Sequence, residues 1–241
     1  MTPPSRGRAA GSAVGSARLW QWRVSGHLAE AARHATVLDP AEHARLAAFH
    51  TAADRDRYLV AHVSLRRILG ERLDLAPAAV RIVRRPCTEC GGPHGRPAVA
   101  DGAGPHFSLS HAGDLVAVAV ADVAVGVDVE EVQPPDVVAE TAPNALHPEE
   151  LRELAALPET ARPAAFARCW TRKEAYLKGT GTGLNTPPVT VRVGTGLRAA
   201  ALPGWHQADV PTLPGYAAAV ATREETTGTT TAVRENEGER R

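Results

Sequence analysis

Three strand-like segments follow one another between residues 107 and 129, with connections too short to hold a helix. Residues 107–110, 115–120 and 123–129 are rich in apolar residues and alternate in the manner of β-strands. Only Ala121 and Asp122 separate the second segment from the third, which is the length of a β-hairpin loop. We therefore expect antiparallel strands joined by hairpins in the middle of the chain.

Helical patterns lie on both sides of these strands. Asp39 and Pro40 are typical of a helix N-cap and first turn, and a longer helical stripe runs over residues 54–70. Further helices are expected from residue 147 and from Pro163 to Gly179. Short strands are expected at residues 80–83, 189–193, 205–210 and 216–221. The order predicts an α+β fold, with helices followed by strands on either side of about residue 122.

The composition favours a globular protein in the cytoplasm. The chain has 241 residues, of which 44% are hydrophobic, enough for a sizeable core. Lys+Arg and Asp+Glu both number 27, so the charge balance argues against a nucleic-acid or membrane-surface binder. No apolar run approaches a membrane span, no signal-peptide core is visible, and three cysteines argue against a disulfide scaffold. Residues 1–16 and 223–241 are expected to be a disordered leader and tail.

The segment GVDVEEV, residues 126–132, carries a pair of carboxylates on one strand face. Side chains alternate along a strand, so Asp128 and Glu130 share the face opposite the valines. Residues two apart lie about 6.6 Å apart along the strand, so both carboxylates can lean towards one hard cation. An ordinary amphipathic strand with a solvated acidic face is the alternative.

The segment WTRKEAYLKGTGTGL, residues 170–184, holds both lysines of the chain, whereas arginines number 25. Trp170, Glu174 and Lys178 share one helical stripe, with Lys173 beside it. The alternative is a surface helix with a solvated ion pair, but Trp170 should draw the stripe towards the protein body. A third carboxylate close to Asp128, with lysines beside it, indicates a site for a divalent metal and phosphate.

The chain resembles the 4′-phosphopantetheinyl transferases at three motifs in order: HFSLSHAGD at residues 106–114, then GVDVEEV, then WTRKEAYLK. The spacing is similar to that of the monomeric Sfp-type branch, and the resemblance covers roughly residues 20–222. It implies two similar α/β halves related by a pseudo-twofold, residues 17–122 and 123–222. The active site would lie in the cleft between them.

The resemblance implies Mg²⁺-dependent transfer of the phosphopantetheine arm of coenzyme A to a serine of an apo acyl or peptidyl carrier protein, with release of adenosine 3′,5′-bisphosphate. It implies a cytoplasmic monomer, active in secondary metabolism, with no nucleic-acid or membrane partner. The implied metal ligands are Asp128, Glu130 and Glu174. Glu174 would also be the general base, and Lys178 would hold the pyrophosphate as a second catalytic residue.

The resemblance also implies a set of residues that bind coenzyme A: Arg45, Arg57, Arg96, Pro97, Ser110, His111, Lys173 and Lys178. Arg57 and His111 match positions that contact the 3′-phosphate. Departures from the family pattern are Ala112 for the second serine of S-H-S, Ser108 for Asn, and Glu42 where a basic residue often stands. Glu42 implies a phosphate pocket that is built differently at this point, and Glu149 could match a carboxylate that some relatives contribute.

Two other classes of function remain as alternatives. Cys87, Cys90 and His94 in CTECGGPH could bind zinc in a nucleic-acid-binding module, but a fourth ligand is not apparent. Another Mg²⁺-dependent phosphotransferase would need a phosphate-cradling loop, and no G-x-x-x-x-G-K-[ST] occurs. Cys169, beside Trp170, is expected to be a buried small hydrophobic residue.

Overall fold

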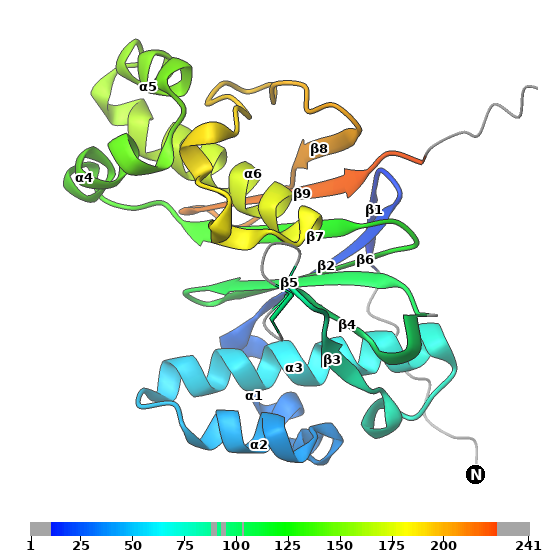
Figure 1. Cartoon of the computed structure of the whole chain (residues 1–241). Helices are drawn as coiled ribbons and strands as arrows, with labels where there is room; N and C mark the ends of the chain where they lie inside the picture. Colours follow the sequence, from blue (N-terminus) through cyan, green and yellow to red (C-terminus); the bar gives the residue numbers. More distant parts are fainter. Residues whose placement is uncertain (1–10, 88–90, 93–94, 103, 226–241) are drawn as a thin grey trace, which may run out of the picture.

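The computed structural model describes residues 11–87, 91–92, 95–102 and 104–225, and it shows an α+β fold (Figure 1). The strands are β1 (Ser12–Val14), β2 (Ala17–Arg23), β3 (Ile82–Arg84), β4 (Pro97–Val99), β5 (His106–Ala112), β6 (Leu115–Ala121), β7 (Val125–Glu131), β8 (Trp205–Asp209) and β9 (Tyr216–Arg223). The α-helices are α1 (Val24–Arg33), α2 (Pro40–Ala47), α3 (Ala52–Leu73), α4 (Pro135–Ala145), α5 (Pro148–Ala155) and α6 (Arg162–Thr180). The class predicted from the sequence is confirmed.

Two antiparallel sheets lie between the helices. One has the strand order β1-β2-β6-β5, the other β7-β9-β8, and β3 and β4 form a separate pair. Helix α3 covers the first sheet and α6 covers the second, so the layers run helix, sheet, sheet, helix (Figure 1). Strands β5 and β7, one from each sheet, lie side by side.

The predicted hairpin at Ala121 and Asp122 is wrong, whereas the one between β5 and β6 is confirmed. Strand β5 pairs with β6 across the turn at Gly113, whose φ is +49°. A Cβ on Gly113 would lie 2.3 Å from the Tyr216 hydroxyl, so the turn needs glycine. After Asp122 the chain instead crosses into the other sheet, where β7 pairs with β9. A short connection allowed a hairpin but could not specify the pairing partner.

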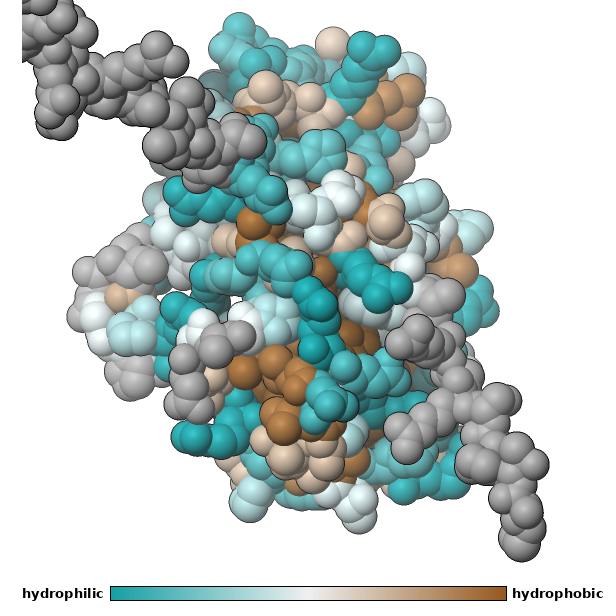
Figure 2. Space-filling model, turned by 90° about the vertical axis from the view of Figure 1, so that its right-hand side faces the viewer, coloured by the Kyte–Doolittle hydropathy of each residue, from teal (hydrophilic) through white to brown (hydrophobic). Residues whose placement is uncertain are grey.

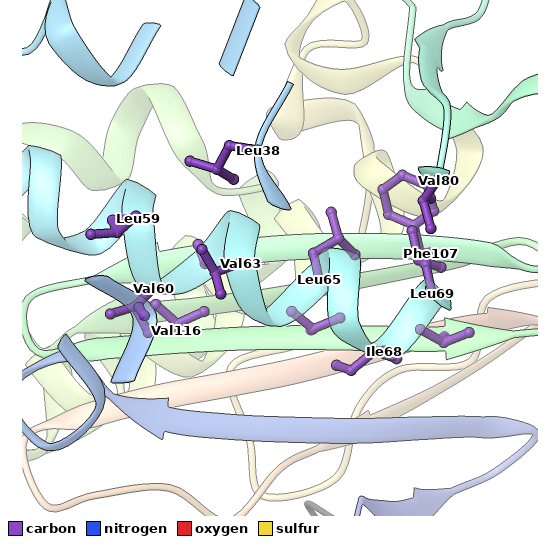
Figure 3. Packing of buried hydrophobic residues seen from close by; sticks show 14 of the residues in the cluster. Leu38, Leu59, Val60, Val63, Leu65, Ile68, Leu69, Val80, Phe107 and Val116 are labelled. Carbon is purple, nitrogen blue, oxygen red and sulfur yellow. The ribbon is translucent and has the colours of Figure 1, made fainter. Parts of the chain in front are cut away.

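The outer core lies between α3 and the first sheet (Figure 3). Helix α3 begins at an N-cap, Thr51, whose side chain accepts from the Asp54 backbone N–H. Its buried aliphatic side chains pack on Phe107 of β5 and Val116 of β6. The labelled members of this cluster are Leu38, Leu59, Val60, Val63, Leu65, Ile68, Leu69, Val80, Phe107 and Val116.

Small residues let the inner layers approach closely. The facing surfaces of the two sheets are built largely of alanine and valine, among them Ala117, Ala119 and Val127, each no more than 1% exposed. On the other face of the second sheet, α6 packs against Gly126. A Cβ on Gly126 would lie 1.8 Å from the Ala175 carbonyl oxygen, which no alanine could tolerate without movement of α6. The glycine therefore fixes how closely α6 lies to β7.

Two further local expectations differ from the structure. Residues 12–14, placed in the disordered leader, form β1, whereas residues 1–10 and 226–241 lie outside the described part of the chain. No strand forms at residues 189–193; Pro188–Thr190 is a 3-10 helix instead. Pro187 and Pro188 lack the N–H donors that a ladder requires. Strand β2 and helices α1 and α4 were not predicted from the sequence.

No helix within the described residues is both long and apolar enough to cross a membrane. The face of the molecule in Figure 2 is predominantly hydrophilic, with smaller hydrophobic areas between the polar side chains.

Gly126→Ala should lower the free energy of unfolding by about 3 kcal/mol, because the added methyl group meets backbone atoms of α6 that cannot rotate away. Urea unfolding followed by circular dichroism measures the change. Gly26→Ala is the matched control: its Cβ would meet nothing closer than 3.9 Å, and alanine in α1 should stabilise by up to about 1 kcal/mol. Equal stability of the two variants would contradict this close contact.

Candidate active site

Asp128 lies at the centre of the predicted carboxylate site, on β7, and is 1% exposed. Its Oδ1 accepts a hydrogen bond from the Ser110 hydroxyl at 2.7 Å and forms an ion pair with Lys178 Nζ at 2.5 Å. Lys178 also donates to the Ser110 hydroxyl at 3.1 Å. Three elements far apart in the sequence, β5, β7 and α6, therefore meet at one carboxylate.

Glu130 and Glu174 lie close enough to Asp128 for the three negative charges to repel one another. Burial and the charge of Asp128 raise the pKa of Glu130 to about 7, although Trp170 donates a hydrogen bond to it. Burial raises the pKa of Asp128, despite the opposing effect of Lys178. The pKa of Glu174 is also raised, by burial first and then by Asp128. The strand face and the helix stripe predicted from the sequence thus converge.

Two oxygens of this cluster are buried and have no hydrogen-bond partner among the described residues: Asp128 Oδ2 and Glu174 Oε1. A buried carboxylate oxygen without a partner costs free energy, and a hard cation with oxygen ligands would satisfy both. The donor set therefore fits Mg²⁺ in its chemistry. In the described part of the chain, however, no group of three or more His, Cys, Asp or Glu side chains is arranged to hold a metal ion.

A cavity of about 650 Å³ opens next to the cluster, and Lys178 lies in its wall. Its lining comes from α2, α3, β3, β4 and β5 on one side, and from α6 and the glycine-rich segment after it on the other. Arg84, Arg96 and Lys178 supply positive charge, whereas Phe107 and Leu177 supply apolar surface. Such a wall suits a ligand that carries both phosphates and an extended apolar part.

Arg96 and Pro97, both predicted to bind coenzyme A, line this cavity. The Arg96 guanidinium donates to the Gly179 carbonyl of α6 at 3.0 Å and lies 3.2 Å from His106 Nδ1. Burial and the neighbouring Arg85 lower the pKa of Arg96. Arg96 therefore ties the β4 side of the cavity to the end of α6.

Arg57 and His111 form a second group of basic side chains, near the turn between β5 and β6. Arg57 donates to the Gly113 carbonyl at 3.2 Å and pairs with Asp54. Reduced hydration and the Arg57 charge lower the pKa of His111. Arg45, the third predicted basic position, is exposed on α2, with its guanidinium 5.1 Å from the centre of the Phe49 ring.

The structure contradicts the prediction that Lys173 binds coenzyme A. Its side chain is 0% exposed and pairs at 2.5 Å with Glu150, which is also 0% exposed. The ammonium group also donates to the carbonyls of Pro188, at 2.9 Å, and of Val191. Every donor of Lys173 is thus engaged inside the protein, Lys173 is not among the residues that line the cavity, and its role is structural.

The structure shows the surroundings of Glu149, Cys169 and Cys87, three further residues singled out in the sequence. Glu149, a possible match to a family carboxylate, forms a surface ion pair with Arg192. Cys169 is 0% exposed, and burial raises the pKa of its thiol, which confirms the prediction of a buried hydrophobic residue. Cys87 is buried, whereas the other two residues of the proposed zinc set, Cys90 and His94, lie outside the described residues.

Sequence reasoning missed the contacts through which three residues support the site. The Ser108 hydroxyl, at the position where the family has Asn, accepts from the Val127 N–H at 3.0 Å and so joins β5 to β7. Ser110, which the resemblance assigns to coenzyme A binding, also holds Asp128 through its hydroxyl. Trp170 holds Glu130 through its indole N–H. The i, i+4 relation of Trp170 to Glu174 was the one signal available for it.

Two family models match consecutive parts of the chain. Residues 21–123 match the model described as 4′-phosphopantetheinyl transferase, N-terminal, and residues 124–231 match the 4′-phosphopantetheinyl transferase superfamily. Together with the carboxylate and lysine motifs now seen to converge, these matches show that the chain belongs to the 4′-phosphopantetheinyl transferase superfamily.

Several curated relatives are similar over more than half of this chain. The 4′-phosphopantetheinyl transferase psf-1 of Bacillus pumilus is 34% identical over 57% of this chain and 55% of its own. The 4′-phosphopantetheinyl transferase HetI of Nostoc is 32% identical over 62% of both chains. The 4′-phosphopantetheinyl transferase Sfp of Bacillus subtilis is 25% identical over 64% of this chain and 65% of its own. The matched region thus spans 55% to 65% of these relatives' length.

Lys173→Met should lower the free energy of unfolding by about 3–5 kcal/mol, because it leaves the buried Glu150 carboxylate without its counter-ion. The control is Arg192→Ala, which removes two surface ion pairs, with Glu149 and Glu153, among side chains that are 33–46% exposed, and should cost at most about 1 kcal/mol. Urea unfolding compares the two. A Lys173→Met protein as stable as wild type, but unable to bind coenzyme A, would restore Lys173 as a ligand contact.

Proposed function

We propose that this protein transfers the 4′-phosphopantetheine arm of coenzyme A to a serine hydroxyl of an apo acyl or peptidyl carrier protein, and releases adenosine 3′,5′-bisphosphate. The observation that carries the proposal is the cluster of Asp128, Glu130 and Glu174 around Lys178, which itself lies in the wall of the 650 Å³ cavity. A cluster of acids with one lysine, next to a basic and apolar cavity, suits a pyrophosphate-bearing substrate.

The proposal includes a division into two halves, residues 17–122 and 123–222, with the active site in the cleft between them. The boundary lies next to the junction of the two family-model matches, residues 123 and 124. A sheet covered by one long helix occurs in each half, α3 in the first and α6 in the second. The cavity draws its lining from both, which supports the placement of the site.

Mg²⁺ is the proposed cofactor, and Asp128, Glu130 and Glu174 are the residues that would hold it. When bound, it would supply positive charge that stabilises the pyrophosphate and the leaving group. The two buried oxygens without partners, Asp128 Oδ2 and Glu174 Oε1, support this assignment.

In the proposed reaction the serine oxygen attacks the phosphorus that carries the pantetheine arm. A new P–O bond forms, the pyrophosphate P–O bond breaks, and adenosine 3′,5′-bisphosphate leaves with the electron pair. Glu174 accepts the serine proton, directly or through one water. Lys178 lies within reach of the same carboxylates and offsets the charge that grows on the leaving phosphate.

The nucleotide end of coenzyme A is proposed to lie against basic side chains of the first half. Arg96 and Pro97 line the cavity, and Arg57 and His111 stand together at the β5–β6 turn. Arg45, exposed on the neighbouring helix, adds positive charge at the same side. These groups would hold the adenylate and its 3′-phosphate while the arm extends towards Lys178.

Glu174→Gln should reduce transfer by about 10²–10⁴-fold, because the amide keeps the size of the side chain but cannot accept the serine proton. The assay follows Mg²⁺-dependent transfer of a labelled arm from coenzyme A to a panel of purified apo carrier proteins. Coenzyme A should still bind to the variant, since the basic residues are unchanged.

Glu140→Gln, on the exposed surface of α4, is the matched control and should transfer at the wild-type rate. Binding of Mg²⁺ alone should alter the fluorescence of Trp170 in wild type, because its indole contacts Glu130, and the Glu174 variant should need more Mg²⁺ for the same change. A wild-type transfer rate in Glu174→Gln would overturn the assignment of this residue.

A further inference from the structure

Glu42 stands where the family often has a basic residue, and the structure shows what replaces that charge. Glu42 is 8% exposed, and its Oε1 lies 3.0 Å from Nδ1 of His62 on α3. His62 lies in the wall of the cavity, beside Tyr58 and Leu65. A basic side chain is therefore present at this end of the cavity, but it comes from α3.

The position of Glu42 is fixed by contacts that leave only one oxygen for His62. Glu42 closes a capping box with Asp39, whose backbone N–H donates to Oε2 at 2.9 Å. The same Oε2 accepts from Nε of the fully buried Arg66 at 2.5 Å. Burial alone would raise the pKa of Glu42. The pKa is nevertheless lowered, because His62, Asp39 and Arg66 all donate hydrogen bonds to the carboxylate. Glu42 is thus a fixed anion that turns Oε1 towards His62.

Tyr58 fixes the plane of the imidazole ring. It lies one helical turn before His62, and their ring centres are 3.8 Å apart, in a stacked arrangement. Glu42 engages Nδ1 from one side, and no hydrogen bond joins Nε2 to another described residue. Glu42 and Tyr58 therefore hold the His62 ring in place. The side chain is 22% exposed and lies in the wall of the cavity, and Nε2 is its remaining nitrogen.

His62 also lies within electrostatic range of the other basic residues at this side of the site. His62 and Arg57 both lie close enough to His111 to interact with it electrostatically. A protonated imidazole donates from both ring nitrogens, so that Nδ1 can donate to Glu42 while Nε2 donates to a phosphate oxygen. Charge-assisted bonds of this kind are among the strongest contacts to phosphate.

We propose that His62 binds the 3′-phosphate of coenzyme A through Nε2, and that Glu42 and Tyr58 are positioning residues that hold its ring. The inference rests on the proposed function for the identity of the ligand. It assigns to this chain a phosphate contact on α3 that compensates for the acidic residue on α2, and it makes His62 a determinant of selectivity for coenzyme A over its 3′-dephospho form.

The test compares the binding of coenzyme A and 3′-dephospho-coenzyme A by isothermal titration calorimetry. His62→Gln should weaken the binding of coenzyme A by about ten- to hundredfold, as expected for loss of a hydrogen bond to a charged group, and leave dephospho-coenzyme A unchanged. His62→Phe, which keeps the stacking on Tyr58 but lacks both ring nitrogens, should give the same selective loss. His43→Gln, exposed on α2, is the matched control and should bind both ligands as wild type does.

Glu42→Gln tests the positioning role, because it keeps the size of the side chain but removes the charge that faces His62. It should reduce the preference for coenzyme A while leaving the affinity for dephospho-coenzyme A unchanged, which a purely structural role would not do.

Four outcomes separate this inference from the proposed function. A selective loss of coenzyme A binding in both His62 variants supports it. An equal loss for the two ligands, or unchanged binding of both, overturns it while the proposed function stands. Failure of the wild-type protein to bind coenzyme A at all would overturn both.

Discussion

The contact of Lys178 with Asp128 and Ser110 is the interaction on which the arrangement of the site depends. Asp128 is 1% exposed, and a carboxylate buried to that degree is costly unless it is paired and hydrogen-bonded. Its partners come from β5 and from α6, so this buried charge is paired only when both sheets and the helix are correctly placed relative to one another. The same contact places the lysine of the C-terminal motif at the wall of the cavity.

Close packing of small residues makes this contact possible. Gly126, two residues before Asp128, lets α6 approach β7 at the level of Ala175, and Glu174 and Lys178 lie on either side of Ala175 in the same helix. The Ser108 hydroxyl accepts from the Val127 backbone N–H and so fixes β5 to β7. The positions of the acidic and basic side chains therefore follow from residues that carry no charge themselves.

The carboxylate cluster could be predicted because it depends on local periodicity. Alternation along β7 places Asp128 with Glu130, and the helical repeat places Glu174 with Lys178. The pairing of β7 with β9 could not be predicted, since loop length allows a hairpin without requiring one. The burial of Glu150 was also invisible, because its partners include Lys173 on another helix and the backbone N–H groups of Val193 and Gly194, some forty residues away.

The two lysines of α6 show how one helix serves both stability and the site. Lys178 comes five positions after Lys173, which at about 100° per residue places the two side chains on well-separated sides of the helix. Lys173 is held by Glu150 and by the carbonyls of Pro188 and Val191, so it fixes the rotation of α6 about its axis. With α6 in this rotation, Lys178 contacts Asp128 and lies in the wall of the cavity. The buried ion pair thus orients the residues proposed for chemistry without contacting them.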